Sequence, residues 1–289
     1  MGLGLYQGRR FHIDTGGYRQ WWPAPAIETA LYLHSQRVTR GFPLNYRKQF
    51  LNATAANTRE IDIARCAFII AGHFQPGLNV DNELKRIDEL ALLARDWPVV
   101  DAETLVDFIS NNQQFRGNRE DYYNISNSLF NHVITSRLGI PITLALVYIS
   151  VLQRLSNHIP LIQTYGINFP AHFLLVVKDQ NSEKLIDPFA GKIVSREACY
   201  EILANLYGER PDPDDRYFQA ATNRQLLRRI LENLKAIYLG KKDSEHAINC
   251  LDFQLMLYPE DSDLLMQQQQ MLAHLRNNNG NMSSDQLLQ

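Results

Sequence analysis

The chain has 289 residues, of which 45% are hydrophobic and 21% charged, as is typical of a globular protein. Its net charge of −2 at pH 7 argues against nucleic-acid binding, and no apolar run is long enough for a membrane span. The three cysteines are far apart and odd in number, which predicts neither a disulfide framework nor a zinc site, and the amino terminus does not resemble a secretory signal. We therefore expect a cytoplasmic protein without a cofactor.

Residues 1–50 are predicted to form an N-terminal arm and a helix. Residues 1–25 are rich in glycine, arginine and aromatic residues and show no periodicity, so we expect a loose arm that packs back onto the domain through its tryptophans. Residues 26–38 have a helical pattern, which ends before the next glycine and proline.

Residues 51–208 are expected to form the main domain, which begins with helices. An apolar helix is predicted over residues 59–73. Asp81 is expected to cap a second helix and Asp101 a third, which covers residues 102–111.

The polar segment 115–124 is expected to be a connection before a short helix that ends at Gly139. Pro141 suits the first turn of the next helix, which runs to Leu155. Because this helix is apolar on almost every face, it is predicted to be the buried central helix of the domain.

Strands are predicted after the central helix, first over residues 161–167 and then as a hairpin. Helices followed by consecutive strands indicate an α+β fold with an antiparallel sheet. The hairpin brings His172 close to Asp187, although a slip of one residue in the register would direct the two side chains to opposite faces.

A polar, proline-rich segment at residues 209–216 predicts a domain boundary. Residues 216–275 are then helical, and residues 233–259 resemble one tetratricopeptide repeat, with Lys235 in place of its usual small residue. One repeat cannot bury both its faces, so we expect it to dock on the rest of the chain or on a partner. Residues 276–289 are predicted to be a disordered tail.

A papain-like site needs three groups: a nucleophile at the start of a buried helix, a histidine on a facing strand, and a carboxylate or amide that orients the histidine. The helix that starts at Pro141, together with His172 and Asp187, supplies these positions. The cysteines Cys66, Cys199 and Cys250 all lie far from the helix start in the sequence.

Several sequence blocks occur in a specific order, namely FRGN, DYYN, NSLFNHVITSRLGIPITLALVYISV, GINFPAHFLLVV and LIDPFAG. Over roughly residues 60–205 this order resembles the SirB1 family, which commonly continues into tetratricopeptide-like helices. Ala171 stands where that family usually has glycine. The resemblance implies a transglutaminase-like fold, but it brings no settled activity.

Thr143 lies closest to the position where a true transglutaminase places its thiol, so its hydroxyl is either a weak nucleophile or a helix-capping group. We therefore expect a non-catalytic transglutaminase-like protein that keeps a His-Asp remnant of the triad and binds a protein or peptide through its tetratricopeptide-like region. The alternative is an acyl-transfer enzyme or hydrolase that uses Thr143, or a water activated by His172 and Asp187. Neither hypothesis involves a metal, nucleic acid or a membrane, and the sequence does not determine the oligomeric state.

Overall fold

The computed structural model describes residues 44–55, 61–97, 99, 101–155, 163–170, 172–178 and 182–285, with side chains described as far as residue 275. The predicted arm and the helix over residues 26–38 lie outside these ranges. No described helix has both the length and the apolar character that crossing a membrane requires.

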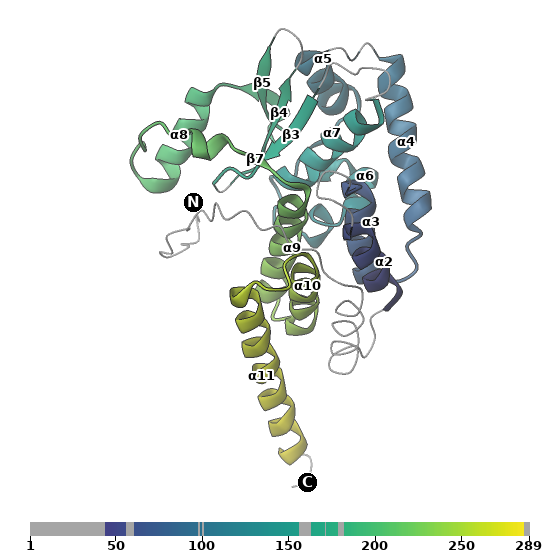
Figure 1. The fold of residues 1–289 in the computed structure, drawn as a ribbon, viewed down its shortest axis with the longest axis vertical. Helices are drawn as coiled ribbons and strands as arrows, with labels where there is room; N and C mark the ends of the chain where they lie inside the picture. The colour runs from purple at the N-terminus through teal and green to yellow at the C-terminus, as the bar shows by residue number, and fades with distance from the viewer. Residues whose placement is uncertain are drawn as a thin grey trace. The chain divides into compact units, whose positions relative to one another are not determined.

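Helices form most of the described chain (Figure 1). The α-helices are α2 (Leu44–Thr54), α3 (Ile63–Phe74), α4 (Val80–Asp96), α5 (Ala102–Val106), α6 (Phe130–Ser136), α7 (Pro141–Leu155), α8 (Arg196–Tyr207), α9 (Asn223–Gly240), α10 (Ser244–Leu257) and α11 (Ser262–Asp285). Three short helices of other types are η1 (Asp107–Asn112), η2 (Ile125–Asn127) and η3 (Asp215–Phe218).

The strands form a five-stranded antiparallel sheet and a separate two-stranded parallel pair. In the described residues they are β1 (Arg116–Gly117), β2 (Leu138–Gly139), β3 (Gln163–Ile167), β4 (Leu174–Lys178), β5 (Glu183–Asp187), β6 (Lys192–Val194) and β7 (Ala220–Ala221). Strands β3 to β6 are neighbours in chain order, and β7 joins the free edge of β3. This arrangement of helices and an antiparallel sheet confirms the predicted mixed fold.

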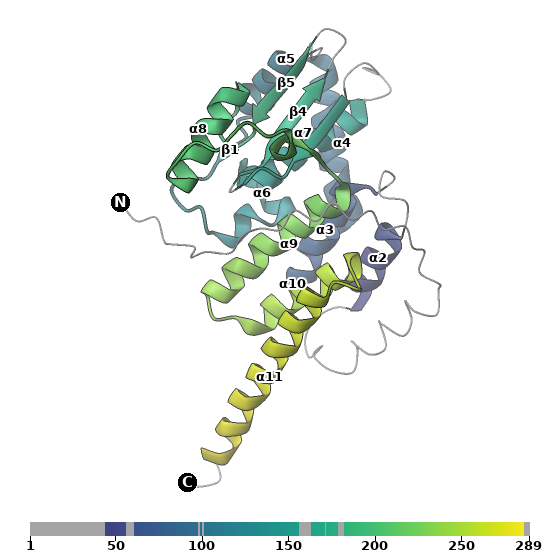
Figure 2. The same cartoon turned by 60° about the vertical axis from the view of Figure 1, so that its left-hand side comes forward.

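Helix α7 is the centre of the protein, as its apolar pattern predicts. The main core contains residues of α7 together with one face of the sheet, formed by Phe173, Leu175, Val177 and Ile186. The opposite face, with Leu174, Val176 and Leu185, packs against α8 through Cys199, Tyr200 and Leu203. Side chains alternate along a strand, so the sheet is buried between these two layers (Figure 2).

Two predicted helix ends are wrong. Helix α4 is capped by Asn79, whose side chain accepts a hydrogen bond from the backbone N–H of Asn82, while Asp81 lies in the first turn. Helix α6 ends at Arg137 in the left-handed conformation (φ 63°), and Gly139 instead belongs to β2. Gly139 is needed there for space, because a Cβ atom at this position would lie 2.9 Å from Thr143 Oγ1.

The helices beyond residue 216 share the main core with the sheet and α7, although the sequence indicates a boundary at residues 209–216. Leu227, Leu231 and Leu234 of α9 are completely buried in that core. Helix α2 spans residue 50, and the structure describes α11 as far as Asp285. The free-energy cost of extending a helix by one residue is much lower than that of starting one. A helix can therefore continue past the residue at which the sequence pattern predicts its end.

Buried polar side chains join the C-terminal helices to α2 and α3. Arg47 Nη2 lies 2.5 Å from Asp252 Oδ2 and donates to Asn249 Oδ1 at 2.5 Å. The same Asn249 oxygen lies 2.9 Å from His73 Nε2, and Gln268 Nε2 donates to Asp252 Oδ1. All five side chains are buried, and these contacts satisfy much of their polar character. Arg47 Nε is the exception, since it is buried without a hydrogen-bond partner among the described residues.

We expect Asp252→Ala to lower the free energy of unfolding by about 3–5 kcal/mol, because it leaves the buried guanidinium of Arg47 without this carboxylate. Urea unfolding followed by circular dichroism measures the loss. Glu260→Ala is the control: this exposed residue lies just after α10 and is expected to stay within about 0.5 kcal/mol of the wild type. Equal losses in the two variants would contradict the proposed importance of the buried pair.

Candidate functional site

The structure confirms the predicted contact between His172 and Asp187. His172 lies just before β4, Asp187 is the last residue of β5, and Nε2 lies 3.0 Å from Oδ1. The side chains retain 14% and 11% of their exposure, so water reaches the pair from one side. The register that pairs Leu175 with Ile186 sets this proximity.

Asp187 is held by more than the imidazole. Its Oδ1 also accepts hydrogen bonds from the backbone N–H groups of Phe189 and Ala190, each at 2.9 Å. Burial raises the pKa of Asp187, but hydrogen bonding and charge from His172, together with the two backbone N–H groups, lower it more, so the net pKa lies below its usual value. Asp187 is therefore a carboxylate at neutral pH.

Thr143 is bound within the start of α7 and is not part of the His-Asp pair. Its hydroxyl donates to Asn127 O at 2.7 Å and accepts from the backbone N–H of Ile140 at 3.1 Å. The side chain is 0% exposed, and the described residues include no hydrogen bond between Thr143 and His172. The arrangement corresponds to the second half of a capping box, in which the third residue of the helix satisfies the N–H at the cap.

The three cysteines do not supply a nucleophile. All are buried, and burial is the largest cause that raises the pKa of each thiol, to about 12 for Cys66 and about 11 for Cys199 and well above its usual value for Cys250. The charge of Asp187 also raises the pKa of Cys199. A thiol in this state is protonated at neutral pH and unreactive.

The sequence did not predict that the connection over residues 115–124 would contact the turn after Asp187. Phe189 covers Gly117, Arg119 lies over the Phe189 ring at 5.2 Å, and Tyr122 meets that ring at 5.7 Å. The contact joins segments about 70 residues apart, so no local spacing signals it. The only sign in the sequence is the pair of tyrosines in an otherwise polar segment.

Buried Asn127 fixes this connection in place. Its side chain donates to the carbonyl oxygens of Asp121 and Tyr122 and accepts from Asn118 Nδ2 at 3.0 Å, while its own carbonyl accepts from Thr143. Asn127 therefore forms hydrogen bonds both with the start of α7 and with the connection over residues 115–124.

Chemically, the arrangement is an oriented imidazole-carboxylate pair without an adjacent nucleophile. Among the described residues, the hydrogen-bond partner of the imidazole is Asp187, at Nε2. Within the described ranges, no group of three or more His, Cys, Asp or Glu side chains comes together as a metal site would need.

Comparison with known proteins gives matches to the central part of the chain. A family model described as the transglutaminase-like superfamily matches residues 74–232. A UPF0162 protein of Xylella fastidiosa (strain 9a5c) is 36% identical over 157 residues, which cover 52% of this chain and 53% of that protein. A UPF0162 protein of Vibrio cholerae is 29% identical over 148 residues, which cover 51% and 53%.

F-box only protein 21 of Mus musculus is 32% identical over 181 residues, which cover 56% of this chain and 26% of that protein. The chain thus spans about half the length of the bacterial relatives and about a quarter of the mouse relative. No solved structure matches the chain significantly.

The matched residues 74–232 make up more than half of the chain and include α7, the five-stranded sheet, His172 and Asp187. The chain belongs to the transglutaminase-like superfamily.

Proposed function

We propose that this chain is a non-catalytic member of the SirB1 family that binds a protein or peptide partner. In this proposal, His172 and Asp187 are what remains of a triad whose cysteine is absent. The observation that carries the proposal is the hydroxyl of Thr143, which is buried and engaged in hydrogen bonds at the start of α7.

Catalysis by a triad depends on a covalent step. A triad accelerates acyl transfer by forming a bond between the nucleophile and the substrate, and a histidine and carboxylate only activate that nucleophile. To attack a substrate, Thr143 would have to break its bonds to Asn127 and Ile140 and leave a buried carbonyl and N–H unsatisfied. The buried, protonated thiols offer no substitute.

The C-terminal helices support the binding half of the proposal. A connection of three residues joins α9 to α10, as expected for an antiparallel pair. Tyr238, Ala247 and Phe253, which fall at or near the spacings of a tetratricopeptide repeat, are buried. One face of α9 packs on the main core. Such helical hairpins commonly present peptide-binding surfaces.

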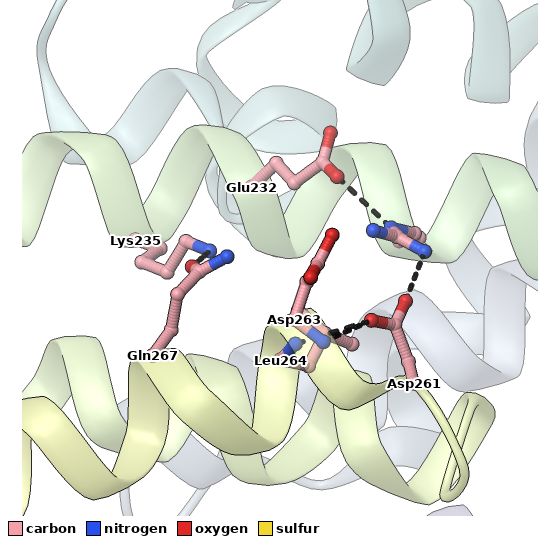
Figure 3. Close-up of polar contacts among 7 residues, drawn as sticks. Glu232, Lys235, Asp261, Asp263, Leu264 and Gln267 are labelled. Atoms are coloured by element: carbon pink, nitrogen blue, oxygen red, sulfur yellow. Dashed lines mark hydrogen bonds and ion pairs between the residues drawn. The ribbon is translucent and has the colours of Figure 1, made fainter. Parts of the chain in front are cut away.

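Polar contacts fix helix α11 to helix α9 (Figure 3). Arg228 of α9 forms ion pairs with Glu232 at 3.0 Å and with Asp261 at 2.9 Å, and Lys235 Nζ donates to Gln267 Oε1 at 2.9 Å. Asp261 also accepts from the first N–H groups of α11, as an N-terminal cap does.

Helix α11 also exposes two neighbouring apolar side chains, Leu265 at 38% and Met266 at 53%. Exposed methionine is suited to contact with a partner because its side chain is flexible and polarisable. We therefore assign the partner contact to this side of α11.

A second candidate function is hydrolysis by a water that His172 activates. The observation that favours it is the oriented and partly exposed pair. A general base of this kind needs no protein nucleophile.

We expect Thr143→Val to lower the free energy of unfolding by about 1–3 kcal/mol, because it leaves the Asn127 carbonyl and the Ile140 N–H without this partner. Thr143→Ser keeps the hydroxyl and loses one methyl group, which is worth about 0.8 kcal/mol. Urea unfolding at pH 7 compares the three proteins. A Thr143→Val variant as stable as the wild type would show that the hydroxyl has no capping role.

The proposal that the protein is non-catalytic is tested by a screen of the purified chain for amidase, protease and amine-transfer activity. We expect no turnover that differs between the wild type and His172→Ala, because no nucleophile is available. Circular dichroism checks that the variant is folded. Activity that His172→Ala abolishes and Thr143→Val retains would overturn the proposal in favour of water activation by the pair.

The proposal that the protein binds a partner is tested by affinity capture. Point variants are used instead of a deletion, because deleting α9 would remove part of the core. We expect the double variant Leu265→Asp and Met266→Asp to lose a partner that the wild type retains, since the charges disrupt an apolar contact. The control is Leu92→Asp, which changes a leucine on α4 that is about as exposed as Met266. Retention by the double variant, or equal loss in the control, would remove α11 from the proposal.

A further inference from the structure

A pocket of about 260 Å³ lies between α4 and α6, away from the proposed partner contact on α11. The two helices contact each other. The pocket is lined by Arg86, Glu89, Leu90, Leu93, Ile134 and Arg137. Its wall therefore combines three aliphatic side chains with two guanidinium groups, and it is large enough for a small organic molecule.

The backbone and ring contacts of Arg137 fix its position at this pocket. The residue ends α6 in the left-handed conformation, and its carbonyl accepts a hydrogen bond from the Arg116 N–H at 2.9 Å. The guanidinium lies 4.4 Å from the centre of the Phe115 ring. A cation held in this way cannot move freely to another partner.

One nitrogen of the Arg137 guanidinium has no acceptor in the part of the chain that the structure describes. Its Nη1 atom is buried and has no hydrogen-bond partner among the described residues. More than nine in ten buried polar groups in proteins are hydrogen-bonded, so an unsatisfied guanidinium nitrogen needs an explanation. An anion in the adjoining pocket would supply the missing acceptor.

The neighbouring charges increase this need. Burial lowers the pKa of Arg137, and the positive charge of Arg86 lowers it further. Arg86 itself forms an ion pair with Glu83 at 3.0 Å. Glu89 also lines the pocket, but it forms no ion pair with either arginine in the described part of the chain. The charge of Arg137 is therefore not balanced by a bonded carboxylate.

We propose that this pocket binds a short aliphatic carboxylate, with the carboxylate group between Arg86 and Arg137 and the alkyl chain against Leu90, Leu93 and Ile134. The planar guanidinium matches a carboxylate through two parallel hydrogen bonds. The aliphatic wall selects a ligand with an apolar tail over an inorganic anion. The site uses neither the His172–Asp187 pair nor α11, so its test is independent of the proposed function.

Hexanoate is the probe, and hexylamine and inorganic phosphate are its comparisons. We expect hexanoate to bind the full chain with a Kd at or below about 1 mM, as the number of its atoms allows. Hexylamine carries the opposite charge and phosphate lacks the tail, so both are expected to bind at least about tenfold more weakly. Ligand-observed NMR and calorimetry measure the three affinities. Equal binding of hexanoate and hexylamine would overturn the proposal.

Substitutions on the wall of the pocket locate the site. Arg86→Gln and Arg137→Gln are each expected to weaken hexanoate binding by about tenfold or more, because each removes a charged donor. Leu93→Glu places a carboxylate at the mouth of the pocket and is expected to abolish binding. Leu92→Glu, at the exposed neighbouring position, is expected to bind as the wild type does.

The two glutamate variants alter exposed residues, so they test the site even if Arg137→Gln does not fold. Equal affinities in Leu93→Glu and Leu92→Glu would show that hexanoate binds elsewhere. Glu89→Gln tests whether a carboxylate of the chain balances Arg137. We expect this variant to bind hexanoate at least as tightly as the wild type, and a loss of binding would contradict the proposal.

Discussion

The burial of α7 on every side is the constraint on which the rest of the structure depends. A helix in this position requires apolar cover all round, which the sheet supplies on one side and α3, α4, α6 and α9 supply elsewhere. Two of its buried polar side chains find partners inside the protein. Tyr148 meets Ser110 at 2.7 Å, and Thr143 meets Asn127 and Ile140. The hydroxyl at the helix start therefore completes the core and is not left free for chemistry.

The His172–Asp187 pair also has a structural role. The Asp187 carboxylate binds the imidazole of His172 and the N–H groups of the turn that follows β5. That turn carries Phe189, which packs on Gly117 and under Arg119. The ionised carboxylate of Asp187 thus orders the turn after β5 and, through it, the connection over residues 115–124. A pair inherited with the fold has a physical reason to persist even where no covalent step follows.

The polar groups of the C-terminal helices and those at the α4–α6 pocket differ in their partners. In the former, Arg47 and Arg228 each have carboxylates within 3.0 Å. The pairs Arg47–Asp252 and Arg228–Asp261 join segments that are distant in the sequence. At the pocket, Arg137 has an aromatic ring but no bonded carboxylate among the described residues. Buried charges are stable when paired, so the first arrangement holds the fold together and the second favours a ligand.

The sequence by itself determined the elements whose signal is local: the span of α7 from its proline and apolar faces, the Asp101 cap, and the antiparallel strands that bring His172 to Asp187. Only the tertiary structure decided which partner each polar side chain takes. Thr143 bonds to a carbonyl 16 residues away, and Arg47 to an amide 202 residues away. Periodicity records which residues are buried, because burial repeats with the helix or strand. It carries no record of contacts between distant segments, and these contacts determine the chemistry of the site.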